Sequence, residues 1–227
     1  MAKILLGATI GDARNKAGAI VYSKNRFGAY LRQKVSPVQP RSTAQLNVRS
    51  NFTSITKSWQ TISATNQAGW TSLASANPVR DKFGNSQILT GAQFYMKVNR
   101  ILANAGLTQL TAPPADQAVD APTSSTLTAT SGGTPVLSLV IAPTPNTADA
   151  VIVRATPGLS KGRSFVQNAL KQVIVKAPPV SSPVNLLTAW QALFGTLQAG
   201  QKIYTEVHYV GINGAASSPN QTFAIST

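Results

Sequence analysis

Carboxylates, histidine and cysteine are all scarce in this sequence. Its 227 residues include six Asp and Glu together, one His and no Cys. General acid–base catalysis depends on carboxylates and imidazoles, nucleophilic thiolates need cysteine, and transition-metal sites are built from the same side chains. The composition therefore argues against an enzyme, against a bound metal or other cofactor, and against a small-molecule substrate.

Long apolar runs are missing as well. No stretch reaches the roughly 18 apolar residues that a membrane span needs. The apolar run within residues 1–8 is short, and Asp12, Arg14 and Lys16 follow it closely, unlike the pattern of a secretory signal peptide. Without cysteine no disulfide framework is possible. We therefore expect neither a membrane segment nor a secretory route.

Basic residues are plentiful by comparison, and they are unevenly placed. Lys and Arg number 20, the formal net charge is +14, and apolar residues make up 43% of the chain, enough for a packed core. Residues 1–57 contain ten of these bases and one acid, Asp12, a net charge of +9. Such asymmetry indicates a region that meets nucleic acid or an acidic partner, and the alternative is a solvated basic face.

Residues 1–41 predict a basic extended arm or hairpin. Strand-like patterns at 19–23 and 27–31 flank a possible turn at 24–26. The prolines that follow predict extended backbone over residues 35–40. The segment has too little apolar surface to form a core by itself.

Residues 42–106 predict a bundle of about three helices. The apolar residues of the first recur at spacings of 4, 3 and 4: Val48, Phe52, Ile55 and Trp59. They form one helical face, which we expect to be core. A second helix is expected over 63–75 and a loop over 79–89. The third begins at the capping-box pattern of Thr90 and Gln93.

The remaining chain predicts a linker and a β domain. Residues 107–122 contain three prolines and are expected to link the two parts with nothing to pack against. Residues 123–227 are rich in Thr, Ser and Val, and alternation replaces the helical period. Candidate strands lie at 126–130, 136–142, 150–156, 171–176, 202–212 and 221–226. The stretch 188–197 fits either a short helix or a strand and turn.

The most specific motif lies near the C-terminus. A Leu-x-x-Gly turn at 197–200 leads into the Tyr-bearing run 203–210, followed by an Asn213-Gly214 turn and Ser218-Pro219. This resembles the penultimate strand and final hairpin of a fibronectin type III domain. The resemblance implies an immunoglobulin/fibronectin type III-like β-sandwich over 123–227, and hence an α+β multidomain protein.

The N-terminal half is similar to a group of uncharacterised proteins encoded by phages and prophages. The similarity covers residues 24–32 and 37–45 and the two tryptophans Trp59 and Trp70. It implies a virion-associated structural protein, capsid-associated, a decoration protein or a tail component, with no known catalytic residues. The expected location is the virion, and the host cytoplasm during assembly. The expected partners are copies of the chain itself and other particle proteins.

Basic and aromatic residues alternate along the first 50 residues. The candidate binding residues are Arg14, Lys16, Lys24, Arg26, Phe27, Tyr30, Arg32, Lys34, Arg41 and Arg49. Bases that neutralise phosphates, interleaved with rings that stack, are what sequence-independent nucleic-acid binding needs. The same residues could instead pack on a neighbouring subunit. We therefore expect a structural particle protein that binds subunits or packaged nucleic acid, or alternatively a nucleic-acid-binding accessory protein with phosphate contacts from residues 14–57.

The sequence contains a single histidine, His208, on an expected strand. His208 lies two residues from Glu206, so both side chains project from the same face of an expected strand. One imidazole and one carboxylate without a third ligand make a poor metal site. We expect a surface pair.

Overall fold

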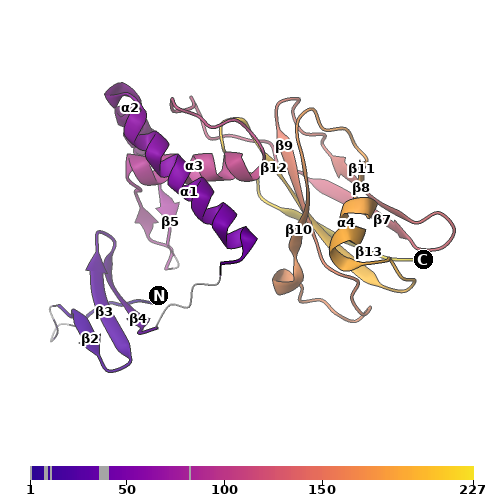
Figure 1. Ribbon diagram of the computed structural model, residues 1–227, viewed down its shortest axis with the longest axis horizontal. Coiled ribbons are helices and arrows are strands. Elements are labelled where there is room, and N and C mark those ends of the chain that lie inside the picture. The colour runs from indigo at the N-terminus through magenta and orange to yellow at the C-terminus, as the bar shows by residue number, and fades with distance from the viewer. Residues whose placement is uncertain (1, 8–9, 11, 36–40, 82) are drawn as a thin grey trace. The chain divides into compact units, whose positions relative to one another are not determined.

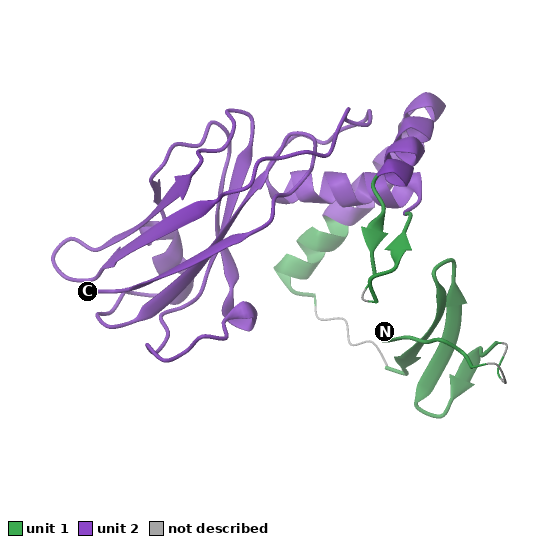
Figure 2. Ribbon diagram, turned by 180° about the vertical axis from the view of Figure 1, so that it is seen from behind, with its two compact units in different colours: residues 1–50, 77–88 green, residues 51–76, 89–227 purple. Residues whose placement is uncertain are grey.

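The computed structural model describes residues 2–7, 10, 12–35, 41–81 and 83–227. It is a mixed α+β protein with helices and several antiparallel sheets (Figure 1). The chain divides into two compact units, residues 1–50 with 77–88 and residues 51–76 with 89–227 (Figure 2). The predicted boundaries after residues 41, 106 and 122 do not coincide with this division.

The first unit contains an antiparallel sheet with the strand order β1-β4-β3-β2. The strands are β1 (Ala2–Lys3), β2 (Asn15–Ala17), β3 (Ile20–Asn25) and β4 (Gly28–Gln33). The predicted hairpin is confirmed as β3 and β4, which pair from Ile20 opposite Gln33 to Asn25 opposite Gly28. Gly28 closes the turn with φ +113°, a conformation that favours glycine. The short strands β1 and β2 give no periodic signal and were not predicted.

The prediction of a loop over 79–89 is wrong, because part of this stretch forms a second short antiparallel ladder. β5 (Val79–Arg80) pairs with β6 (Ser86–Gln87) in a hairpin that belongs to the first unit. The Asp81 carboxylate closes it by accepting hydrogen bonds from the backbone N–H groups of Phe83 (2.8 Å) and Asn85 (2.9 Å). Such side-chain-to-backbone bonds are how Asp stabilises tight turns. Of the expected extended stretch 35–40, residues 36–40 lie outside the described residues.

The three predicted helices are confirmed as α1 (Thr43–Thr61), α2 (Ala64–Ala76) and α3 (Gly91–Asn104). The predicted capping box is present, because Thr90 and Gln93 each bond the other's backbone N–H. The helical core consists of Ile55, Trp70, Ala74, Phe94, Tyr95, Val98 and Leu102.

The predicted core stripe of α1 is wrong in its first half. Ile55 is fully buried and Trp59 packs against the core, but Val48 and Phe52 are 48% and 53% exposed. The helical core reaches α1 only in its second half, through Ile55 and Trp59. Periodicity located the apolar face correctly but could not show how much of it is covered.

The stretch 107–122 also differs from its prediction. Leu107 and Leu110 pack against the helical core, and the Thr111 carbonyl accepts a hydrogen bond from Trp70 Nε1 at 3.0 Å. Further along, Val119 packs against the core of the C-terminal sheets. The prolines fix the backbone, but the apolar side chains between them do find contacts.

Residues 123–227 form two antiparallel sheets, with strand orders β11-β8-β7 and β10-β9-β12-β13. The strands are β7 (Ser124–Thr130), β8 (Val136–Ala142), β9 (Ala150–Ala155), β10 (Lys171–Lys176), β11 (Val184–Asn185), β12 (Lys202–Val210) and β13 (Asn220–Ile225). All six predicted strands are confirmed, and only the two-residue β11 was missed. The ambiguous stretch 188–197 contains the helix α4 (Leu187–Phe194).

The two sheets share one apolar core. Leu137 and Leu139 of β8 meet Val151 and Val153 of β9 in a single buried cluster. Trp190 of α4 joins it, 1% exposed, with its indole N–H donating to the Thr156 carbonyl at 2.9 Å. The opposite face of β9 and β12 is buried too, against the C-terminal end of α3. Burial on both faces explains why these strands have nearly continuous apolar sequences.

Candidate functional site

The register of the N-terminal sheet places two predicted bases on one face. Lys16 of β2 lies opposite Val21 of β3, which lies opposite Arg32 of β4. Residues directly opposite one another in antiparallel strands project from the same face. Neighbouring strands are about 4.8 Å apart, so Lys16 and Arg32 flank Val21 at a Cα separation of about 10 Å.

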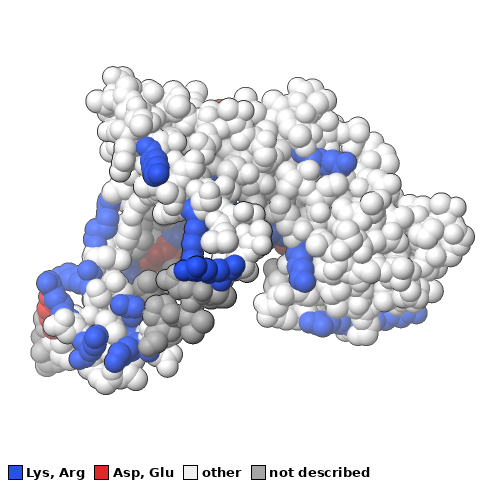
Figure 3. Space-filling model, viewed as in Figure 1, with Lys and Arg blue, Asp and Glu red and all other residues white. Residues whose placement is uncertain are grey.

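Five predicted bases line one concave surface of this unit, the cationic cavity. It measures about 640 Å³, and its basic wall residues are Arg14, Lys16, Lys24, Arg26 and Arg32. On the face shown in Figure 3, Lys and Arg side chains gather over the N-terminal sheet. All five side chains are exposed, so they are accessible to a ligand of opposite charge.

These bases differ in how far their charge is neutralised. Arg14 forms an ion pair with Asp12 at 2.9 Å. The Arg26 guanidinium donates to the Ile88 carbonyl at 3.1 Å and lies 5.1 Å from the centre of the Phe27 ring. Lys16, Lys24 and Arg32 form no ion pair with any residue that the structure describes. The cavity therefore presents at least three uncompensated positive charges.

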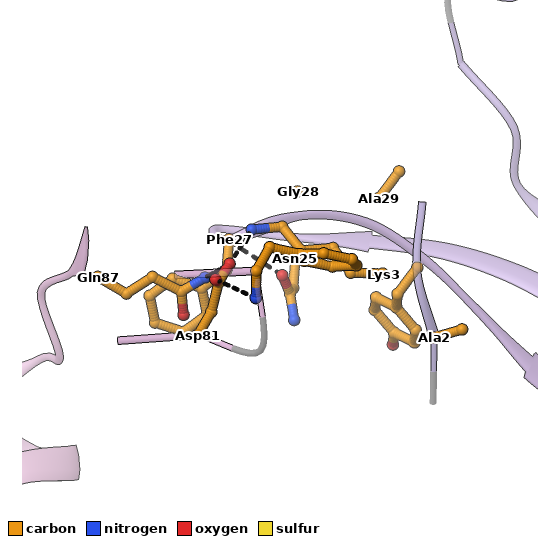
Figure 4. Close-up of a pocket in the computed structure, with 10 residues that line it drawn as sticks. Ala2, Lys3, Asn25, Phe27, Gly28, Ala29, Asp81 and Gln87 are labelled. Carbon is orange, nitrogen blue, oxygen red and sulfur yellow. Dashed lines mark hydrogen bonds and ion pairs between the residues drawn. The ribbon is translucent and has the colours of Figure 1, made fainter. Parts of the chain in front are cut away.

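The two predicted aromatic residues, Phe27 and Tyr30, line a neighbouring hollow, the aromatic cavity. It measures about 450 Å³ and lies between the sheet and the β5–β6 hairpin, which contributes Phe83 and Gln87. Figure 4 shows Phe27, Lys3 and Gln87 around it. Asn25 lines both the aromatic and the cationic cavity, so the two hollows adjoin.

Asp81 joins the hairpin to the first strand at the wall of the aromatic cavity. Its carboxylate accepts a hydrogen bond from Lys3 Nζ at 2.6 Å and another from Gln87 Nε2 at 3.1 Å (Figure 4). The Lys3 ammonium, aided by the backbone donors of Asn85 and Phe83, lowers the pKa of Asp81 from 3.8 to about 2 against the opposing effect of burial. The carboxylate is therefore ionised at neutral pH, and both of its oxygens already accept hydrogen bonds.

Three predicted residues are placed elsewhere. Lys34 follows β4, and its backbone N–H donates to the Ala19 carbonyl at 2.7 Å. Arg41 precedes α1 and Arg49 lies on it, both exposed. In the sequence, Arg41 and Arg49 follow residues 36–40, which lie outside the described part of the chain.

Sequence reasoning missed Lys3, Asp81 and Phe83. Lys3 lies on a two-residue strand that no periodic pattern marks, and its partner Asp81 is 78 residues away. The turn around Gly84 was visible in the sequence as Phe83-Gly84-Asn85. A turn motif cannot indicate which distant strand it will meet.

The expected surface pair of His208 and Glu206 is wrong. Glu206 is buried, and it pairs across the sheet with Arg154 at 3.4 Å. Burial, together with the nearby Arg154 charge, lowers the pKa of His208, and Glu206 opposes that change. The cross-strand neighbour therefore determines the carboxylate's partner, which spacing along one strand could not show.

The described residues were also considered as metal ligands and as membrane-spanning helices. Within the described ranges, no three His, Cys, Asp or Glu side chains gather where they could hold a metal ion. Across the same residues, every helix is too short or too polar to span a lipid bilayer.

No protein-family model matches the chain, and comparison with curated proteins finds no match either.

Proposed function

We propose that this protein is a non-enzymatic structural component of a phage virion or similar particle, and that its basic N-terminal sheet binds the backbone of packaged nucleic acid. The observation that supports the binding role is the cationic cavity with its unpaired Lys16, Lys24 and Arg32. The particle role is supported by the resemblance of residues 24–32 and 37–45, with Trp59 and Trp70, to phage-encoded proteins and by the scarcity of catalytic side chains.

Nucleic acid suits this surface better than a carboxylate-rich protein does. Phosphates repeat along a backbone, so a row of separate bases can each neutralise one and release a counterion. The protein itself has only six acidic residues, so attraction between copies of the chain by charge alone is weak. Contacts to the phosphate backbone carry no sequence information, so the expected binding is independent of sequence.

Replacing two cavity bases tests this role. In the double variant Lys16→Gln/Arg32→Gln, two phosphate contacts are lost while the exposed positions leave the fold intact. With about 0.7 counterion released per contact on a single strand, affinity for a 20-nucleotide oligonucleotide should fall about 25-fold at ~0.1 M salt. Fluorescence anisotropy of a labelled oligonucleotide measures the dissociation constant of each protein.

Lys171→Gln/Lys176→Gln is the matched control, because it also removes two charges and both residues are exposed bases of β10 in the other unit. It should bind as the wild type does. Equal losses in the control and the double variant would point to net charge alone and would overturn the proposed site.

A second role, contact between subunits, is favoured by the exposed stripe of α1. Val48 and Phe52 continue the face on which Ile55 is buried, and both are about half exposed. We infer that a second copy of the chain covers this stripe in an assembly. Phe52→Ser should then lower the sedimentation coefficient of concentrated protein, and an unchanged monomeric value in both proteins would contradict it.

We also infer that residues 123–227 are a fibronectin type III-like sandwich. Support comes from the seven strands in two facing sheets and from the two-sheet core. The fourth strand, β10, joins the sheet of the third, sixth and seventh strands, whereas the constant-type immunoglobulin arrangement places it on the other sheet. Such a module would present loops and edges on the particle while the basic sheet holds the genome.

A further inference from the structure

The aromatic cavity contains features that phosphate binding does not use. Its walls include three rings, Phe27, Tyr30 and Phe83, and the Phe83 side chain is 64% exposed. Three rings around one hollow offer aromatic faces and edges against which a planar group can stack. The volume of about 450 Å³ accommodates a planar group of the size of a nucleobase.

Charge selects what can enter this cavity. The Asp81 carboxylate is ionised at neutral pH and already accepts from Lys3, Gln87 and the hairpin backbone. An ionised carboxylate in the wall repels a phosphate, and Lys3 is already paired with it. The cavity therefore favours an uncharged aromatic group, whereas the cationic cavity favours the charged backbone.

The two cavities adjoin in a way that fits one polymer. Asn25 lies in both walls, and Arg26 lines the cationic cavity while its guanidinium packs over the Phe27 ring. Among the described residues, Asn25 Nδ2 and Gln87 Oε1 have no hydrogen-bond partner. One donor and one acceptor are thus available to the edge of a planar heterocycle.

We propose that the aromatic cavity binds an unstacked nucleobase of single-stranded nucleic acid, whose adjacent phosphates lie in the cationic cavity. The inference rests on the proposed backbone-binding function and names its substrate class. A base inside a duplex has both faces covered by its neighbours, so it cannot stack on Phe27 or Phe83. Stacking on rings is tolerant of sequence because every base has a π-face.

The test uses two probes of equal length and charge, a 12-mer of oligothymidylate and the abasic deoxyribose-phosphate backbone. Phe83→Leu and Phe27→Leu keep apolar volume but remove the ring. Each should weaken oligothymidylate binding by about tenfold and leave abasic binding unchanged. Phe165→Leu is the matched control, because Phe165 is 68% exposed in the other unit.

A second measurement does not depend on how the variants fold. Photocrosslinking of the wild-type chain to 4-thiothymidine oligonucleotide should map to Phe27, Tyr30 or Phe83 by mass spectrometry. Crosslinks confined to other residues overturn the inference.

The outcomes separate the two proposals. If wild type binds the abasic backbone as tightly as oligothymidylate, or binds duplex more tightly than single strand, base stacking is wrong and backbone binding stands. If wild type binds none of these probes but binds an acidic protein, both proposals are wrong.

Discussion

The few carboxylates of this chain each have a defined partner, which is where single residues matter most. Asp81 bonds Lys3 and the backbone of its own hairpin, and Glu206 is buried beside Arg154. With so few acids, most bases of the N-terminal sheet remain unpaired. We therefore expect substitutions of the unpaired bases to change stability less than substitutions of the paired residues do.

Lys3→Gln should raise the pKa of Asp81 from about 2 toward 3.8. In the wild type the ion pair stabilises the fold fully above the ordinary carboxyl pKa, and this contribution is lost as pH falls through about 2. A titration of the Asp81 carboxyl carbon by NMR measures the change. An unaltered pKa in the variant would mean that the backbone donors alone hold the charge.

His208→Gln should make stability less dependent on pH. Burial and Arg154 lower the pKa of His208, so the unfolded chain binds more protons just below the ordinary value of 6.5. The free energy of unfolding of the wild type should therefore fall as pH drops through that window. Urea midpoints at pH 7 and pH 5 should differ less in the variant, and an equal difference in both proteins contradicts this account.

The apolar face of helix α1 is buried in its second half and exposed to solvent in its first half. Its second half packs Ile55 and Trp59 into the helical core, while Val48 and Phe52 in its first half stay half exposed. Elements of this kind are stabilised at one end and available for contact at the other.

Ile55→Ala and Phe52→Ser should therefore have different effects on stability. Removing a fully buried isoleucine side chain should lower the free energy of unfolding by about 2–5 kcal/mol. Phe52→Ser should change it by no more than about 0.5 kcal/mol, as expected for a surface position. Urea unfolding of the isolated chain measures both, and similar losses would mean that the first half of α1 is packed in solution.

The sequence predicted the regular elements well because their periods are local properties. The capping box at Thr90 and the alternation in β8 both lie within short windows and are confirmed. Pairings between distant segments have no such local signal. The Lys3–Asp81 contact, the Glu206–Arg154 pair and the joint use of Asn25 by two cavities all depend on tertiary structure.

In the candidate site, too, the residues with a local signal were predicted and those brought in from a distant segment were not. Its bases and two of its rings were predicted from alternation along the first 50 residues, because composition alone marks them. The third ring, Phe83, comes from a hairpin that begins only at Val79, far along the chain from the end of β4 at Gln33. The sequence could therefore predict a strip of bases and rings but not a cavity.

For the whole molecule, the positive charge is concentrated in one part of the chain. Residues 1–57 hold most of the net charge, whereas the C-terminal sheets bury one large apolar core and place few acids at the surface. A particle component built in this way would use one region to hold a polyanion and the other to present a folded module.

The most direct test of the central claim is the salt dependence of nucleic-acid binding by the full chain. The logarithm of the association constant for a single-stranded 20-mer, plotted against the logarithm of salt concentration, should have a slope between about −2 for three contacts and about −3.5 for five. In Lys16→Gln/Arg32→Gln the slope should become shallower by about 1.4. A slope near zero, or the same slope in both proteins, would contradict phosphate binding by the cationic cavity.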